Sequence, residues 1–284
     1  MVDIDFVYNQ DVFAKLKFII PQDKKPTYKS SALTGGAPEV FFQTEYRSVN
    51  IKDIRSVYNF FSLETNGFSL LKNKTNVKNF YDDDAIETTY KDEIEILLQE
   101  TTGAKEIFIF DYTRRSDSND GGAENPDGKR EPADRVHVDY TETSGPKRAI
   151  EIIGKNKFEE CVKKKYRISQ INVWRPIAGP VKRSPIAFAD ALSIRSNDLV
   201  ATDQIFPDRI GEIYHLLHSD LHKWFWVSNM NIDEVLLLKG WDSLDDGRAR
   251  YTPHGSFKLP NHADCLSPRE SIEVRAFLVY HDQK

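Results

Sequence analysis

The pattern of apolar and polar positions divides the chain at about residue 105. Before that point, apolar side chains recur at helical spacing in two segments, which predicts a helix over 51–61 and a second over 84–103. Asp84 can cap the second helix, and Gly103 stands where a helix of this length ends. We expect both helices to pack against a sheet. Their apolar stripes are Ile51, Ile54, Val57, Tyr58 and Phe61, and then Ile86, Tyr90, Ile94, Leu97 and Leu98.

From Lys105 onward the pattern is typical of β-strands, because short runs of branched and aromatic residues alternate with turn formers. Two helices are predicted among these strands, around 158–165 and 209–217. Many strands that follow an N-terminal part with helices indicate a mainly β sandwich or barrel with helices on one side. The predicted strands are EIFIFDY (106–112), RVHVDYT (135–141), RISQINVW (167–174), KWFWVSNM (223–230), EVLLLKGW (234–241) and SIEVRAFLVY (271–280).

Composition narrows the class of protein further. The 284 residues include 17 Phe, 12 Tyr and 4 Trp, enough for a large core, and the net charge of −5 does not indicate nucleic-acid binding. No apolar run approaches the length of a membrane helix, and no Gly-rich turn indicates a nucleotide-binding α/β fold. Cys161 and Cys265 cannot form a disulfide framework, so we expect buried thiols and a cytoplasmic protein.

The segment 116–134 consists almost entirely of turn formers and charged residues. It is predicted to be either a surface loop or a lid over an active site, since long loops without internal structure are uncommon unless they have a function.

The strand 135–141 carries the first candidate chemistry. Alternate side chains of a strand share a face, so His137 and Asp139 project together while Val136, Val138 and Tyr140 pack on the other side. An imidazole beside a carboxylate, joined by a distant histidine, is the 2-His-1-carboxylate arrangement that binds Fe(II) and leaves positions open.

The His-x-Asp pattern is not selective by itself, because it also occurs at His218/Asp220 and His262/Asp264. His218 follows the predicted helix over 209–217, and His262 lies in a turn region with Pro and Asn. Only the pair on the strand 135–141 has a suitable context.

The remaining ligands must come from the C-terminal part of the chain. His254 is our candidate for the third metal ligand. Arg269, with the Ser271 hydroxyl two residues on, has the spacing to clamp the far carboxylate of a dicarboxylate co-substrate. Arg275 is a second candidate on the same face, and the alternative for each arginine is a salt bridge at the rim.

This order of residues resembles the Fe(II)/2-oxoglutarate-dependent dioxygenases. More specifically, it is similar to the fungal gibberellin-desaturase and AsaB-like hydroxylases grouped with the cephamycin methoxylation protein CmcJ, a group that includes an endoperoxide-forming enzyme. The resemblance covers roughly 105–281. The similar stretches are HVDYT, INVWRPIAGPVKRSPIAFADALSI, HKWFWVSNMNIDEVLLLKGWDS and RESIEVRAFLVY.

The resemblance implies a double-stranded β-helix (a jelly-roll, cupin-like barrel) with flanking helices. From the chain length and the change of pattern at Lys105, we expect one domain over 1–284, in which the helices and strands of 1–104 buttress a barrel core over 105–284. The resemblance also implies that His137, Asp139 and His254 bind Fe(II), that 2-oxoglutarate chelates this iron, and that O2 is activated to oxidise an unactivated C–H bond. Hydroxylation, desaturation, ring closure or peroxide formation can follow.

Other side chains have two interpretations each. Asn172 and Trp174 share a face and could line the co-substrate pocket, although Trp174 could equally be core. Arg175 could anchor the end of its strand or reach the pocket. Two interpretations also fit His222, Trp224 and Trp226: they could form an aromatic wall for an apolar substrate, or they could belong to an ordinary packed face. We expect Asp82, Asp83 and Asp84 to form a solvated helix start, and His215, His218 and His281 to lie at the surface.

Three functions are therefore compared. The favoured one is an oxygenase acting on an apolar secondary metabolite such as a terpenoid or meroterpenoid. The others are a cupin-like metal oxygenase that does not use 2-oxoglutarate and a non-catalytic β-sandwich binding module. We expect a small-molecule substrate, no nucleic-acid or membrane partner, and a homodimer as the default for a protein of this size.

Overall fold

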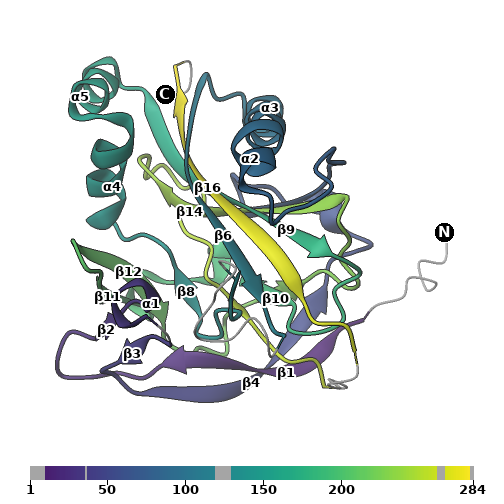
Figure 1. Cartoon of the computed structure of the whole chain (residues 1–284). Coiled ribbons are helices and arrows are strands. Elements are labelled where there is room, and N and C mark those ends of the chain that lie inside the picture. Colours follow the sequence, from purple (N-terminus) through teal and green to yellow (C-terminus); the bar gives the residue numbers. More distant parts are fainter. Residues whose placement is uncertain (1–9, 36, 119–128, 261–265, 282–284) are drawn as a thin grey trace, which may run out of the picture.

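Two β-sheets form the body of the protein in the computed structural model, which describes residues 10–35, 37–118, 129–260 and 266–281 (Figure 1). The ten-stranded sheet has the order β1 (Val12–Ile19), β4 (Thr44–Asp53), β13 (Trp224–Trp226), β10 (Ile186–Ala189), β15 (His254–Ser256), β8 (His137–Val138), β12 (Ile210–Leu216), β11 (Leu199–Ile205), β2 (Thr27–Lys29) and β3 (Glu39–Val40). The six-stranded sheet has the order β5 (Phe68–Lys72), β14 (Glu234–Asp242), β9 (Arg167–Ala178), β16 (Glu270–Tyr280), β6 (Glu106–Ser116) and β7 (Lys129–Arg130).

The chain passes back and forth between the two sheets. It runs from β8 in the large sheet to β9 in the small one and returns to β10, and later it alternates again through β13, β14, β15 and β16. This winding is that of a double-stranded β-helix, so the predicted fold class is confirmed.

The central strands of the small sheet are buried on both faces. One face of β9 and β16 carries Ile171, Val173, Ile272 and Val274, which pack against the helix α3 (Lys91–Thr102). Helices α4 (Ser144–Ile153) and α5 (Lys155–Lys164) pack near the end of the same sheet, where their side chains join Trp241, Phe277 and Val279 (Figure 1). Helices cover this outer face of the small sheet, so its opposite face lines the interior between the two sheets. On that interior face, β9 carries buried polar side chains.

The helix predicted over 84–103 is present. It consists of α2 (Asp83–Ala85), a π-helical turn η2 (Ile86–Tyr90) and α3 (Lys91–Thr102), and its predicted apolar stripe is buried. The predicted cap was wrong by two residues: Asp82, not Asp84, accepts hydrogen bonds from the backbone N–H groups of Asp84 and Ala85. Asp82 has the extended backbone that a capping residue needs, whereas Asp84 already lies within the first turn. Gly103 ends the helix with a positive φ of 73°.

Two other helix predictions were wrong. In the segment 51–61, Ile51 belongs to β4 and pairs with β1, and only η1 (Tyr58–Phe60) is helical. The segment 209–217 contains β12, which is hydrogen-bonded to β11 on one side and to β8 on the other. In both segments, pairing with a neighbouring strand outweighs a helical pattern of about three turns or fewer.

The remaining helices include one that was predicted and one that was not. The helix predicted over 158–165 is α5 (Lys155–Lys164), and α4 (Ser144–Ile153) precedes it without having been predicted. Short helical segments connect the strands elsewhere: α1 (Ser31–Thr34), η4 (Ala191–Ser193) and η5 (Ser196–Asp198).

Residues before 105 are hydrogen-bonded into both sheets. Strands β1 and β4 extend the large sheet beside β13, and β5 forms the edge of the small sheet beside β14. Cys161 is buried, as expected, whereas Cys265 and the pair His262/Asp264 lie outside the described residues. Within the described part of the chain, no helix is long and apolar enough to cross a membrane.

Candidate metal and co-substrate site

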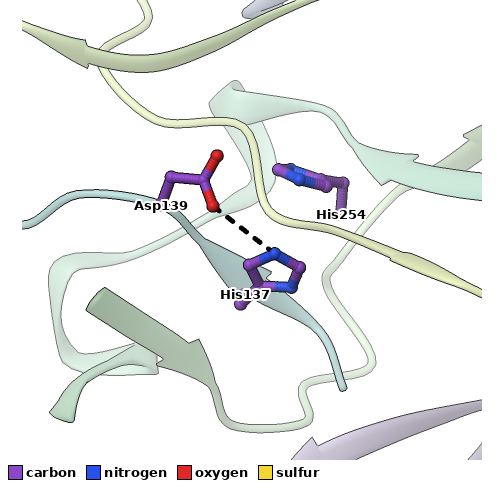
Figure 2. A group of neighbouring side chains, drawn as sticks. All are labelled: His137, Asp139 and His254. Atoms are coloured by element: carbon purple, nitrogen blue, oxygen red, sulfur yellow. Dashed lines mark ion pairs between the residues drawn. The ribbon is translucent and has the colours of Figure 1, made fainter. Parts of the chain in front are cut away.

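Three side chains from two distant parts of the chain converge between the sheets. His137 begins β8, Asp139 follows directly after this short strand, and His254 begins β15. Strands β8 and β15 are neighbours in which His137 and His254 lie opposite each other. One ligand atom from each of the three residues lies within 4.8 Å of the others, and Figure 2 shows the three side chains pointing toward a common centre.

Backbone hydrogen bonds fix the orientation of both imidazoles. Nδ1 of His137 lies 2.8 Å from the carbonyl oxygen of Arg135, and Nδ1 of His254 lies 2.9 Å from that of Thr252. Because a carbonyl oxygen can only accept, each Nδ1 carries the proton and each Nε2 keeps a lone pair. Nε2 of His137 lies 3.6 Å from Oδ1 of Asp139. This is the tautomer that a metal-binding histidine requires.

The charges of the cluster also suit a metal. Burial, together with the neighbouring His254, lowers the pKa of His137 to about 3, so its ring is neutral at pH 7. Burial opposes ionisation of Asp139, but Arg275, then His137 and His254, hold the pKa of this carboxyl well below its usual range. The cluster therefore presents a neutral His137 imidazole and an ionised carboxylate, beside the imidazole of His254.

The second oxygen of Asp139 is held by two neighbours. Oδ2 accepts a hydrogen bond from Nδ2 of Asn172 at 2.6 Å and one from Nε of Arg275 at 2.9 Å. Asn172 and Arg275 lie opposite each other in the register of β9 and β16. The rest of the Arg275 guanidinium is also occupied, since it pairs with Asp111 at 2.5 Å and with Glu273.

Arg269 has a different environment, immediately before β16. It is only 3% exposed, its Nη1 donates to the carbonyl oxygen of Ser184 at 3.0 Å, and its guanidinium carbon lies 5.6 Å from the ring centre of Trp174. Its Nε is buried and has no hydrogen-bond partner among the described residues. Burial, then repulsion from Arg115, lowers the pKa of Arg269 to about 9. These are the properties of a buried cation without a full counter-charge.

The neighbours of Arg269 complete this region. Ser271, two residues on, is buried and lies opposite Arg115 of β6. Trp174 belongs to an apolar core cluster and also contacts Arg269, so both of its interpretations apply.

Arg175 and the aromatic residues 222–226 lie elsewhere. Arg175 anchors its strand, because it donates to the hydroxyl of Tyr90 and to the carbonyl oxygens of Asn73 and Ile232. Trp224 and Trp226 belong to a core cluster, and His222 lies 3.0 Å from a carboxylate oxygen of Asp198.

The expectation that His215 lies at the surface was wrong. This residue is 2% exposed and lies opposite His137 in the pairing of β12 with β8. The error follows from the wrong helix prediction over 209–217, because strand alternation would have placed His215 on a buried face. His218 is partly buried with its ring against Phe18, and His281 stacks on Tyr166.

A cavity of about 1460 Å³ opens beside the cluster, with His137, Asp139 and Arg275 in its wall. Both ends of the segment 116–134 line it, through 117–118 and 130–134. The predicted lid itself falls mostly on 119–128, which lies outside the described residues.

Comparisons with known proteins agree on one family. A family model described as "Oxidoreductase/YMDC permease-like domain" matches residues 16–279. The hydroxylase/desaturase efuI of Hormonema carpetanum is 34% identical over 271 residues, which are 88% of this chain and 89% of that protein. The alpha-ketoglutarate-dependent dioxygenase phiK of a fungal species is 30% identical over 246 residues, 83% of this chain and 85% of that protein. The chain belongs to the Fe(II)/2-oxoglutarate-dependent dioxygenases.

A solved structure supports the same assignment. The iron and alpha-ketoglutarate-dependent endoperoxidase NvfI superposes with a TM-score of 0.81 and 25% sequence identity, over 94% of this chain and 97% of that one. The predicted family is confirmed, and with it the dependence of this dioxygenase on Fe(II), 2-oxoglutarate and O2. Its substrate is a small molecule.

Proposed function

We propose that His137, Asp139 and His254 are the Fe(II) ligands of this dioxygenase. The observation that carries the proposal is the convergence of the three side chains, whose ligand atoms lie within 4.8 Å of one another. Two neutral imidazoles and one carboxylate are the donor set of the facial triad of Fe(II) oxygenases, and the adjoining cavity gives access to the open positions. When bound, Fe(II) with 2-oxoglutarate and O2 supplies the oxidation of an unactivated C–H bond.

The co-substrate is proposed to bind at Arg269. Its Nε lacks a partner among the described residues, and a carboxylate would both accept from it and provide the missing counter-charge. Ser271 contributes a hydroxyl beside it, and Trp174 covers the guanidinium and limits the access of water. Arg275 is not proposed as the clamp, because its guanidinium already pairs with Asp111, Asp139 and Glu273.

Asn172 and Arg275 are proposed to be positioning residues. Both hold Oδ2 of Asp139, so Oδ1 is left facing Nε2 of His137, where a shared ion would lie. Such neighbours of metal ligands orient the ligand and tune its donor strength.

The substrate is proposed to be an apolar secondary metabolite such as a terpenoid or meroterpenoid. The volume of about 1460 Å³ exceeds that of most small-molecule pockets, which measure about 300–1,000 Å³. The relatives support the type of reaction, since the NvfI structure is that of an endoperoxidase and efuI is a hydroxylase/desaturase. The apolar part of the wall includes Phe13, Phe110, Tyr140, Phe206, Ile213 and Phe257.

The test is to add Fe(II) and 2-oxoglutarate to the protein without oxygen and record the visible absorption spectrum. We expect a metal-to-ligand charge-transfer band in the wild type. The band should be absent in His137→Ala, and Arg269→Leu should need a much higher 2-oxoglutarate concentration to produce it. A wild type without the band, or a band unchanged in His137→Ala, would refute the proposed iron site. An unchanged 2-oxoglutarate requirement in Arg269→Leu would refute the clamp alone.

We also propose that the enzyme works in the cytoplasm as a homodimer. The buried free thiol of Cys161 is compatible with a reducing compartment. Light scattering coupled to size-exclusion chromatography should give twice the chain mass of 32.7 kDa. A mass of one chain would contradict the dimer.

A further inference from the structure

Two polar side chains at one side of the cavity, the partly buried Arg135 and the buried His215, have no role in the proposed iron and co-substrate sites. Arg135 lies two residues before His137, so extended backbone places both on the same face. His215 lies opposite His137 on β12, where that pairing also puts their side chains on one face. Both residues line the cavity.

Arg135 lies against two aromatic rings. Its guanidinium carbon lies 5.4 Å from the ring centre of Tyr28 and 5.9 Å from that of Phe42. Its Nε is buried without a hydrogen-bond partner, and its side chain forms no ion pair with any described residue. These cation–π contacts position a guanidinium whose N–H groups remain available to an acceptor oxygen.

The acidic side chains of the cavity do not neutralise Arg135, since several are paired with other cations. Asp111 and Asp139 pair with Arg275. In the same way, Asp134 pairs with Lys17 and Glu212 with Lys25. A bound molecule can therefore supply an acceptor for Arg135.

His215 supplies a hydrogen-bond acceptor beside the Arg135 donor. Its ring lies against the same two aromatic residues, 4.9 Å from Phe42 and 5.9 Å from Tyr28 between centres. The Thr202 hydroxyl donates to the carbonyl oxygen of Val200 at 3.3 Å, so its oxygen accepts from Nδ1–H of His215 at 2.9 Å.

The other ring nitrogen of His215, Nε2, then carries a lone pair. No described residue hydrogen-bonds to it. Nε2 of this tautomer is therefore available as a hydrogen-bond acceptor.

We propose that Arg135 and His215 form a two-point substrate subsite. Arg135 donates to a carboxylate or carbonyl oxygen, and Nε2 of His215 accepts from a hydroxyl on the adjacent carbon. The inference rests on the proposed function in that the subsite shares a strand face with the iron ligand His137. It specifies the substrate further: the molecule carries a hydroxy-acid or hydroxy-carbonyl group at one end, and its apolar body extends along the cavity past the iron site.

Binding to the metal-free protein tests the subsite without requiring iron. The probes are 3-hydroxy-2-naphthoate, 2-naphthoate without the hydroxyl and 2-naphthol without the carboxylate, each titrated by calorimetry. The wild type should bind the first most tightly. Arg135→Gln should weaken both naphthoates about tenfold and leave 2-naphthol unchanged. His215→Phe should reduce the affinity for 3-hydroxy-2-naphthoate to that for 2-naphthoate.

Matched variants show whether the loss of affinity is specific to Arg135. Arg209→Gln removes another cavity-lining guanidinium, one stacked on Phe206, and should leave all three affinities unchanged. Arg269→Leu should also leave them unchanged, and a loss there would place the probe in the co-substrate site and overturn the inference. Arg135→Lys keeps the positive charge but lacks the paired N–H donors of the guanidinium. Its affinity for the two naphthoates should lie between those of wild type and Arg135→Gln, and it replaces Arg135→Gln if that variant does not fold.

The remaining outcomes separate this inference from the proposed function. Three results would overturn the subsite. Wild type and Arg135→Gln could bind the naphthoates with equal affinity, Arg135→Gln could lose the same affinity for all three probes, or the wild type could show no saturable binding. Arg135→Gln should retain the anaerobic Fe(II)/2-oxoglutarate band. If the wild type lacks that band but shows the probe pattern, the proposed function fails while the subsite stands.

Discussion

At the residue scale, the two oxygens of Asp139 have separate roles. Oδ2 is fixed by Asn172 and Arg275, and Oδ1 faces His137. An aspartate held by one oxygen does not need to be ordered when the metal binds, so part of the entropic cost of forming the site is met during folding.

Arg275→Gln should therefore weaken metal binding by about ten- to a hundredfold. Titration of the metal-free protein with Co(II), followed by its visible absorption, measures this affinity independently of turnover. Arg275→Lys keeps a positive charge near Asp139 and should restore part of the affinity. Arg148→Gln, which removes a cavity-lining arginine paired with Glu151, should have no effect. An affinity of Arg275→Gln equal to that of wild type would contradict the positioning role.

The depressed pKa of His215 predicts a pH-dependent stability. The unfolded chain protonates this residue near pH 6.5 while the folded state does not, so its contribution to stability is lost as the pH falls below 6.5. The unfolding free energy should therefore be smaller at pH 5.5 than at pH 7.5. Urea unfolding of the metal-free protein at both pH values should show a smaller pH effect in His215→Phe than in wild type. Equal pH effects in the two proteins would contradict a neutral buried His215.

At the scale of elements, local signals and strand pairing compete. The helix over 83–102 has three turns of apolar periodicity, a cap and a terminal glycine, and it forms as predicted. The segments 51–61 and 209–217 offer only short apolar patterns, and there the hydrogen bonds of β4 and β12 with their neighbours decide the structure.

The cap of this helix can be tested by a pair of substitutions. Asp82→Ala removes an acceptor for two backbone N–H groups and should cost about 1 kcal/mol of unfolding free energy. Asp84→Ala removes no cap and should cost less. Chemical denaturation of both variants measures the difference. An equal or larger effect of Asp84→Ala would contradict the assignment of the cap.

At the scale of the whole molecule, the N-terminal part and the barrel are hydrogen-bonded together. We propose that 1–104 and 105–284 form one domain, because β1 and β4 continue the sheet of the barrel beyond β13, and β5 pairs with β14.

Thermal unfolding should accordingly occur in one transition. Circular dichroism reports all strands, whereas tryptophan fluorescence reports the surroundings of four side chains that all lie from 174 onward, two of which pack against the N-terminal part. The two midpoints should coincide, because breaking the pairing of β4 with β13 would expose buried surface of both parts. Two separated midpoints would contradict a single domain.

The sequence by itself determined the mainly β class, the long helix, and the shared face of His137 and Asp139, because these depend on residues close together in the chain. The tertiary structure decided what depends on distant residues. It brought His254 beside His137 through the pairing of β8 with β15, and it surrounded Arg275 with carboxylates while leaving Arg269 without a full counter-charge. It also buried His215 beside Arg135. Alternation along a strand fixes which side chains share a face, but only the register between strands fixes which of them meet.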